Sequence, residues 1–226
     1  MMRFKKITLM ILTAAMSLSL MAGCGNTKES STEEVSSTET SEESSVESSA
    51  ESSAEESESS VDEDDDTVHL TVKLDSTDGT MEFYLPDGWS DLKDELSEEV
   101  DSGYTVVAGA LDEAVFFMAA SESKSGNSIS DQETYHDELV KIITSNESLT
   151  DVSEQTKSEI NLSASGFDAY ETRFTATYEE QSVTYWVITT EDDNCFYQMC
   201  GWTTTSNALK EGDKILAVAD GFYVIG

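Results

Sequence analysis

Two histidines and two cysteines are the residues beyond the N-terminal region whose types could support catalysis or metal binding. His69 and His136 are far apart, and neither belongs to an H-x-x-x-H pair of the kind that holds zinc. Cys195 and Cys200 are five residues apart in one predicted strand. An extended backbone would separate their Cα atoms by about 16 Å, and a disulfide needs less than about 7 Å. We therefore expect two free thiols, and we predict no metal site, no cofactor and no catalytic residue.

Both histidines are expected at the surface. His69 lies on the polar side of the first predicted strand, and His136 lies near the start of a predicted helix, beside Asp137. A metal or acid–base role for His136 is the alternative. Trp89 follows Gly88 at a turn, where a ring is less committed to core packing than inside a strand. Trp89 and His136 are therefore the candidate ligand-binding residues.

The aromatic rings of the later predicted strands are a further group that could contact a ligand, because their flat faces suit sugars and peptides. Packing within a sheet is their expected role, and a ligand groove is the alternative. Carboxylates such as Glu82 and Asp87 could serve a hydrolase. Acidic residues are so frequent here, however, that these two do not stand out from a solvated surface. The rings concerned are those of Tyr185, Trp186, Tyr197 and Trp202.

Cys24 carries the clearest chemical signal. The first six residues include three basic side chains, residues 7–22 are mostly apolar, and Ala22-Gly23 precede the cysteine. This is the layout of a secretory signal, and it resembles the lipobox of bacterial lipoproteins. The resemblance implies that residues 1–23 are a signal peptide and that Cys24 carries fatty acids such as palmitate. The protein would then be extracytoplasmic and lipid-anchored to the bacterial cell membrane. The apolar stretch is itself shorter than the roughly 20 residues that span a bilayer.

Residues 24–66 are predicted to be the lipidated cysteine followed by a disordered tether. The tether is almost entirely Ser, Thr, Glu and Ala, has no aromatic residue and ends in the acidic run 62–66. Such a segment cannot bury enough apolar surface to offset its ordering entropy. Fully extended, residues 25–66 would reach about 140 Å. A loose calcium site on the acidic run is the less favoured alternative, since the Gly and distant Glu of an EF-hand loop are missing.

The charge of the remaining chain excludes one class of partner. Residues 67–226 contain 31 acidic and 8 basic side chains, for a net charge of −23. A surface of this charge repels nucleic acid and anionic lipid, so we expect no nucleic-acid binding. Solubility is the expected reason for the acidity, and attraction of cations is the alternative.

Residues 67–226 are predicted to form one domain, because 160 residues suffice for a single core. Alternating apolar residues between turn signals predict strands, and apolar residues spaced by three and four predict helices. The run 114–120 is apolar on both faces, which indicates a sheet covered on both sides. The expected strands span 68–74, 80–85, 104–110, 114–120, 152–162, 169–178, 182–190 and 194–203.

Three helices are expected between these strands. The first is short and weak and covers 92–100. The second begins at Ser130, with Glu133 completing a capping box. The third begins near Ser206, is broken or weakened by Gly212 and ends at Gly221 as its C-terminal cap. Residues 222–225 would then pack back on the sheet.

A strand that runs into Pro-x-Gly-Trp, here residues 83–89, opens the domain, and a helix that leads into Phe222 closes it. These features resemble the PsbP-like family. That family includes the PsbP protein of photosystem II, a small Ran-binding nuclear factor and bacterial lipoproteins of unknown function. The resemblance implies an α+β fold, an antiparallel sheet of about six or more strands with helices on both faces (an α/β/α sandwich). It implies no shared catalytic residues. Further residues that carry the likeness are Gly166, Ala169, Tyr170 and Phe174.

Two classes of function remain. We expect a surface-anchored lipoprotein whose domain is a non-catalytic interaction module, with an envelope protein, a wall polymer or a small ligand as partner. The alternative is a cell-envelope hydrolase, or a protein that binds a small ligand or cation. A carboxylate of raised pKa in a pocket would favour the enzyme. An exposed apolar patch would favour the module.

Overall fold

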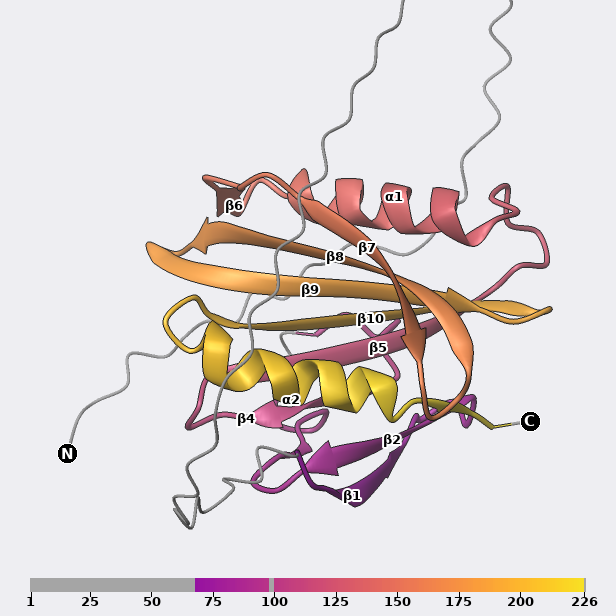
Figure 1. The fold of residues 1–226 in the computed structure, drawn as a ribbon, viewed down its shortest axis with the longest axis horizontal. Coiled ribbons are helices and arrows are strands. Elements are labelled where there is room, and N and C mark those ends of the chain that lie inside the picture. Colours follow the sequence, from indigo (N-terminus) through magenta and orange to yellow (C-terminus); the bar gives the residue numbers. More distant parts are fainter. Residues whose placement is uncertain (1–67, 98–99, 226) are drawn as a thin grey trace, which may run out of the picture. The chain divides into compact units, whose positions relative to one another are not determined.

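The computed structural model describes residues 68–97 and 100–225, so the predicted signal peptide, Cys24 and the tether lie outside the described residues. Within these two ranges the chain forms eleven strands and two helices (Figure 1). None of the helices in this part of the chain is long and apolar enough to cross a membrane.

Eight of the strands in the described residues form one antiparallel sheet, in the order β3-β4-β5-β10-β9-β8-β6, with β7 also paired to β8. The predicted antiparallel sheet of six or more strands is therefore confirmed. Between β8 and β9, Glu179 and Glu180 both have positive φ, as a type I′ hairpin turn requires. The strands are β3 (Ser90–Asp91), β4 (Val106–Ala110), β5 (Val115–Ser123), β6 (Leu149–Thr150), β7 (Thr156–Leu162), β8 (Phe167–Tyr178), β9 (Gln181–Glu191) and β10 (Cys195–Thr204).

A smaller sheet joins the two ends of the domain. β1 (Leu70–Asp75) and β2 (Met81–Pro86) form an antiparallel hairpin, and β11 (Tyr223–Val224) pairs with the free edge of β2. The predicted return of the last residues to a sheet is thus confirmed. Their partner is the N-terminal hairpin, because Tyr223 lies opposite Glu82.

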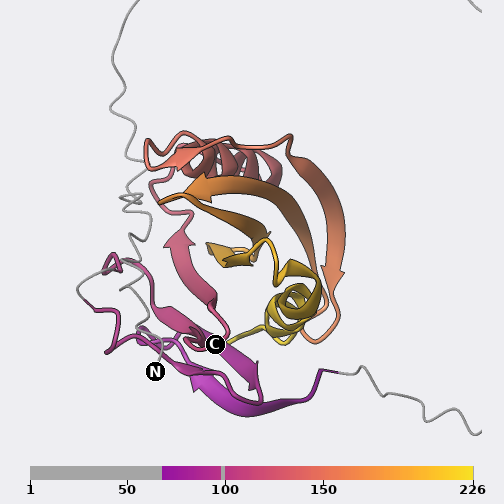
Figure 2. The ribbon, with the colours of Figure 1, turned by 90° about the vertical axis from the view of Figure 1, so that its left-hand side faces the viewer.

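The helices are α1 (Gln132–Thr144) and α2 (Ala208–Asp220). Figure 2 shows the larger sheet curling around α2, with α1 on its outer side and the smaller sheet closing its inner side. Alternate side chains of β10 pack on opposite sides of the larger sheet. Met199 packs in the same apolar cluster as Ile215 of α2, whereas Cys200 packs in the cluster of Leu139 of α1. Cys195 packs against the α2 cluster, and both thiols are free as predicted.

Three predictions about helices were wrong. In the described part of the predicted helix 92–100, residues 93–97 form turns, although Leu96 N donates to Leu92 O and Val100 N donates to Leu96 O. So few apolar residues do not offset the cost of helix nucleation. Asp131 caps α1 in place of Ser130: its carboxylate accepts the Thr134 N–H at 2.8 Å. α2 begins after Asn207 and runs through Gly212 without a break, since Gly212 packs directly on Trp186.

Candidate functional site

His136 is fully buried, so the expectation of a surface histidine was wrong. It faces β8 and β9, where Nδ1 lies 2.9 Å from Thr189 Oγ1 and Nε2 lies 2.7 Å from Thr172 Oγ1. Burial and, secondarily, the charge of Lys157 lower the pKa of the imidazole to about 4. A neutral ring whose two nitrogens are both occupied by threonine hydroxyls is a structural residue of the α1 interface.

Trp89 belongs to the opposite side of the sheet. Its ring is 4% exposed and packs in the cluster that α2 covers, and its Nε1 has no hydrogen-bond partner among the described residues. Because His136 lies on the α1 side, the structure does not bring the two candidate residues together. Trp89 and His136 therefore do not belong to one site, and a ligand role for either residue stays a prediction.

The later aromatic rings pack in the core as expected, and the alternative of a ligand groove is wrong, because all four are at most 8% exposed. Of the two carboxylates considered for a hydrolase, Asp87 is exposed and accepts the Thr71 hydroxyl at 2.7 Å. The ion pair and hydrogen bond with Lys73 hold the pKa of Glu82 below its usual value. A carboxyl group that donates a proton in hydrolysis needs a raised pKa instead.

Glu122 and Glu171 are carboxylates whose pKa is raised by burial. Glu122 accepts the Tyr135 hydroxyl at 3.1 Å and the Asn127 amide at 2.9 Å, so both of its oxygens are used inside the domain. Neither carboxylate lines the hollow between α1 and β10, which has no room for a water molecule. Among the described residues no three His, Cys, Asp or Glu side chains are grouped to hold a metal ion. The hollow is lined by Tyr104, Leu139, Ile143, Gln198, Met199 and Cys200.

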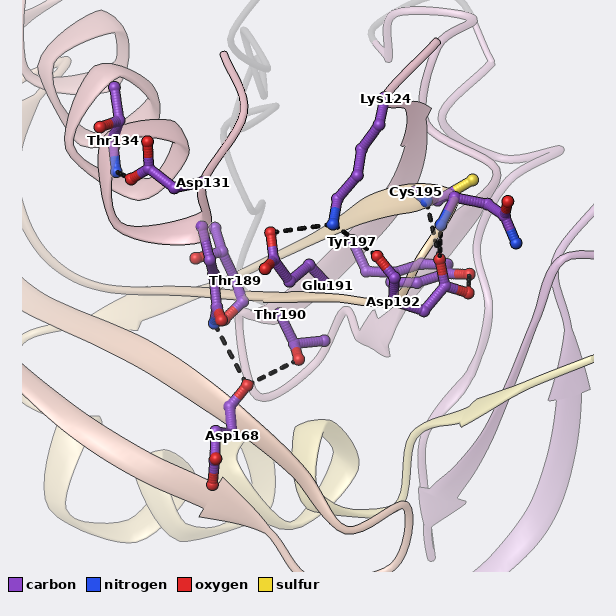
Figure 3. Close-up of polar contacts among 12 residues, drawn as sticks. Lys124, Asp131, Thr134, Asp168, Thr189, Thr190, Glu191, Asp192, Cys195 and Tyr197 are labelled. Carbon is purple, nitrogen blue, oxygen red and sulfur yellow. Dashed lines mark hydrogen bonds and ion pairs between the residues drawn. The ribbon is translucent and has the colours of Figure 1, made fainter.

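A polar cluster at the β9–β10 turn shows how charges are neutralised in this domain (Figure 3). Lys124 donates to the Asp192 carbonyl, lies 3.1 Å from Glu191 Oε2 and covers the Phe196 ring. Asp192 in turn closes the turn by accepting the Cys195 N–H at 2.7 Å and the Tyr197 hydroxyl at 2.8 Å. Burial, with the Asp192 charge next, raises the pKa of the Cys195 thiol, which makes it a weak nucleophile.

Every basic side chain of the described residues contacts another group of the domain, and all except Lys93 and Arg173 form an ion pair with a carboxylate. Lys210 and Lys214 each bridge Glu113 and Glu211, at 2.8 Å and 3.0 Å respectively, and Lys157 bridges two carboxylates of α1. The basic side chains are far fewer than the acidic ones, so most carboxylates of the described residues form no ion pair. The eight basic residues are Lys73, Lys93, Lys124, Lys141, Lys157, Arg173, Lys210 and Lys214.

The outer face of the smaller sheet carries two aromatic rings, of which that of Tyr223 is exposed and that of Tyr84 is half-buried. Residues directly opposite in antiparallel strands share a face, and the register pairs Lys73 with Tyr84, Asp75 with Glu82, and Glu82 with Tyr223. The rings of Tyr84 and Tyr223 meet edge to face, with centroids 6.2 Å apart. We call these five residues, Lys73, Asp75, Glu82, Tyr84 and Tyr223, the tyrosine face.

Glu82 holds this face together. Its Oε2 lies 2.6 Å from Lys73 Nζ, which also lies 3.1 Å from Asp75, and it forms a hydrogen bond with Tyr84. The hydrogen bonds to Glu82 and Asp75 raise the pKa of Lys73 to about 12. Tyr223 is 41% exposed and Asp75 is 54% exposed at its side chain. These contacts hold the side chains together on the outer face of the smaller sheet, where Lys73, Asp75 and Tyr223 are exposed to solvent.

Exposed apolar side chains also occur in and beside the smaller sheet. Of the five large hydrophobic side chains that are exposed in the described residues, Tyr223 belongs to the tyrosine face, Ile225 follows β11, and Val72 lies opposite Leu85 and therefore on the other face. Sequence reasoning missed this surface because Tyr84 and Tyr223 lie at opposite ends of the domain. The only signal was the expectation that residues 222–225 return to a sheet.

Comparisons with known proteins give a likeness of fold. No family model matches the chain, and no curated protein matches it. Among solved structures, cyanobacterial PsbP (CyanoP) from Synechocystis sp. PCC 6803 has 16% identity and a TM-score of 0.48, covering 68% of this chain and 91% of that one. A PsbP protein is among the matches. The likeness concerns the fold alone.

Two further matches come from other bacteria. LpqN, described as involved in cell envelope biogenesis of Mycobacterium tuberculosis, has 11% identity and a TM-score of 0.49, covering 70% of this chain and 92% of that one. A protein of unknown function from Pseudomonas aeruginosa, PA94, has 11% identity and a TM-score of 0.38, covering 67% and 94%.

Proposed function

We propose that this chain is a bacterial lipoprotein, anchored through Cys24, whose domain from residue 67 onward is a non-catalytic binding module at the cell envelope. The signal sequence and its cysteine support the anchor, and the composition of residues 25–66 supports a long polar tether. The observation that carries the binding role is the tyrosine face.

The tyrosine face has the features of a contact surface. Tyrosine supplies a large flat ring and a hydroxyl at little cost in conformational entropy, which is why it is enriched in binding surfaces. The other tyrosine and tryptophan rings of β9 and β10 are buried, whereas Tyr223 is open to solvent and packs edge to face with Tyr84. Tyr223 therefore offers a solvent-accessible ring to a partner, beside the half-buried ring of Tyr84.

The anchor is tested by the substitution Cys24→Ala. The wild-type chain is expected to incorporate an alkynyl palmitate label in the bacterium and to remain in the membrane pellet after a high-salt wash. The Cys24→Ala chain is expected to carry no label and to leave the pellet, because it lacks the thiol to which the lipid is attached. Cys195→Ala is the matched control and keeps both properties. A labelled or membrane-bound Cys24→Ala chain would contradict the proposal.

The binding role is tested by site-specific photocrosslinking in intact cells. A benzophenone amino acid replaces Tyr223 in one chain and Leu209, which is 90% exposed on α2, in the other. We expect an adduct of defined mass from position 223 that is absent from position 209. Adducts from position 209 alone would place the contact on another surface, and no adduct from either position would argue against a binding module.

A further inference from the structure

We infer that the tyrosine face binds a basic polypeptide segment, with arginine or lysine side chains against the rings of Tyr84 and Tyr223 and beside the Asp75 carboxylate. This inference rests on the proposed binding role and names the partner's chemistry. Three observations carry it: the rings have no cation of their own, the charges of the face are incompletely paired, and the whole domain is acidic.

Elsewhere in the described residues, three aromatic rings of the larger sheet lie against cations of the domain itself, and two of these rings, Phe196 and Trp186, are buried. Lys124 lies 4.9 Å from the centroid of Phe196, Lys157 lies 4.6 Å from that of Tyr170, and the Arg173 guanidinium lies 5.0 Å from Trp186. Contacts of this type are favourable, most of all for arginine. No cation of the described residues covers Tyr84 or Tyr223. These rings can therefore accept a cation from a second molecule.

The charges around the rings favour the same kind of ligand. Lys73 is the one cation of the tyrosine face, and it is shared by Glu82 and Asp75. The face therefore has a net negative charge, and Asp75 is more than half exposed at its side chain. Asp87, which accepts the Thr71 hydroxyl of β1, adds another exposed carboxylate nearby. A guanidinium on a tyrosine ring would find a carboxylate partner within the same sheet.

The charge of the domain selects a polypeptide over a sugar polymer. Six of the eight basic side chains are in ion pairs with carboxylates of the domain, and the net charge of residues 67–226 is −23. The acidic run 62–66 also ends four residues before β1 begins in the sequence. The negative electrostatic potential of the domain attracts a basic polypeptide segment and repels phosphate-rich polymers. It does not attract a neutral glycan.

The inference is tested by binding of a fluorescent 12-residue peptide of alternating Arg and Ser to the full chain. We expect binding that weakens steeply between 50 mM and 500 mM salt. We expect the combined substitution Tyr84→Ala and Tyr223→Ala to weaken it at least about tenfold, because two cation–ring contacts are lost. The combined change Tyr84→Phe and Tyr223→Phe keeps both rings and is expected to stay within about twofold of the wild type.

A charge control separates the face from the overall acidity. Glu179→Gln with Glu180→Gln removes two charges at the β8–β9 turn and is expected to change the affinity less than about twofold, whereas Asp75→Asn is expected to weaken it severalfold. Equal losses in both variants would overturn the inference, because the attraction would then come from net charge alone. Each variant is first shown by thermal unfolding to keep the wild-type transition.

The remaining outcomes are also decisive. If a neutral chitin tetrasaccharide binds through Tyr84 and Tyr223 and the peptide does not, the face binds a glycan and the inference is wrong. If the peptide does not bind at 50 mM salt, the inference is overturned as well. Crosslinks from position 223 in cells would then leave the proposed binding role standing with a different partner, so the two failures can be told apart.

Discussion

Acidification from pH 6.5 to pH 4 is expected to lower the free energy of unfolding of this domain by about 3 kcal/mol through His136 alone. The imidazole is fully buried, and its pKa in the folded state is lowered to about 4. In the unfolded chain the group titrates near 6.5. Between these pH values the unfolded chain binds a proton that the folded chain does not, so stability falls with pH and the full loss is reached below pH 4.

The groups around the ring explain the direction of this effect. Burial is the main cause, Lys157 of β7 adds repulsion, and Asp137 opposes it with a weaker attraction. The hydroxyls of Thr172 and Thr189 can accept hydrogen bonds from the charged ring as well as from the neutral one, so the hydrogen bonds do not themselves exclude the proton. The loss of stability at low pH therefore comes from burying the charged imidazolium away from water.

The measurement is urea unfolding at pH 7 and pH 4 for the wild type and His136→Gln. The variant keeps hydrogen-bonding atoms but cannot titrate, so it should lose about 3 kcal/mol less than the wild type over this range. The comparison cancels the contributions of carboxylates such as Glu122, which both chains share. His69→Gln, at an exposed position just before β1, is the control and should follow the wild type. Parallel losses in wild type and His136→Gln would refute the assignment.

Replacing Gly201 by alanine is expected to destabilise the domain by about 2–3 kcal/mol. Gly201 lies on β10 beneath α2, and a Cβ atom there would lie 2.2 Å from Ile215 Cγ2 and 3.2 Å from Ile215 Cγ1. Ile215 is fully buried and cannot turn away without disturbing its neighbours. The helix would have to move away from the sheet, which would open the packing around Trp186 as well.

The cause is tested with a double-mutant cycle. Ile215→Ala alone should cost about 2–5 kcal/mol, and the double variant Gly201→Ala with Ile215→Ala should cost at least about 1 kcal/mol less than the sum of the two. Gly103→Ala is the control, since its nearest atom is the flexible Asp101 carboxylate at 3.1 Å, and it should stay within about 0.5 kcal/mol. Strictly additive costs would show that the Ile215 contact is not the cause.

The strands could be predicted because their signals are local. Apolar alternation along β1 and β2, and the short acidic turns on either side of β9, mark both the strands and their antiparallel pairing. The start of α1 was misplaced by one residue, because Ser130 and Asp131 are equally good N-caps by residue type and only the hydrogen bond to Thr134 N decides between them.

His136 was misplaced for a different reason. Its polar type suggested the solvent side of α1, although its spacing of three, four and seven residues from Leu139, Val140 and Ile143 puts it on the buried stripe. The threonine hydroxyls that form hydrogen bonds with the buried ring come from β8 and β9. Partners so distant in the sequence cannot be predicted from the helix sequence alone. The tyrosine face depends likewise on one long-range pairing, that of Glu82 with Tyr223. Lipidation of Cys24 and the tether lie outside the described residues and stay predictions.

The place of β1 in the smaller sheet determines how mechanical force would travel through this protein. A pull from an anchored tether enters the domain at Leu70, the first residue of β1, and β1 is bonded only to β2 among the strands. A partner held on the tyrosine face would grip β1, β2 and β11 themselves. Tension between membrane and partner would then cross a single hairpin, while the eight-stranded sheet and both helices stay unloaded. The β1–β2 hairpin would then form a short mechanical link between the tether and the partner.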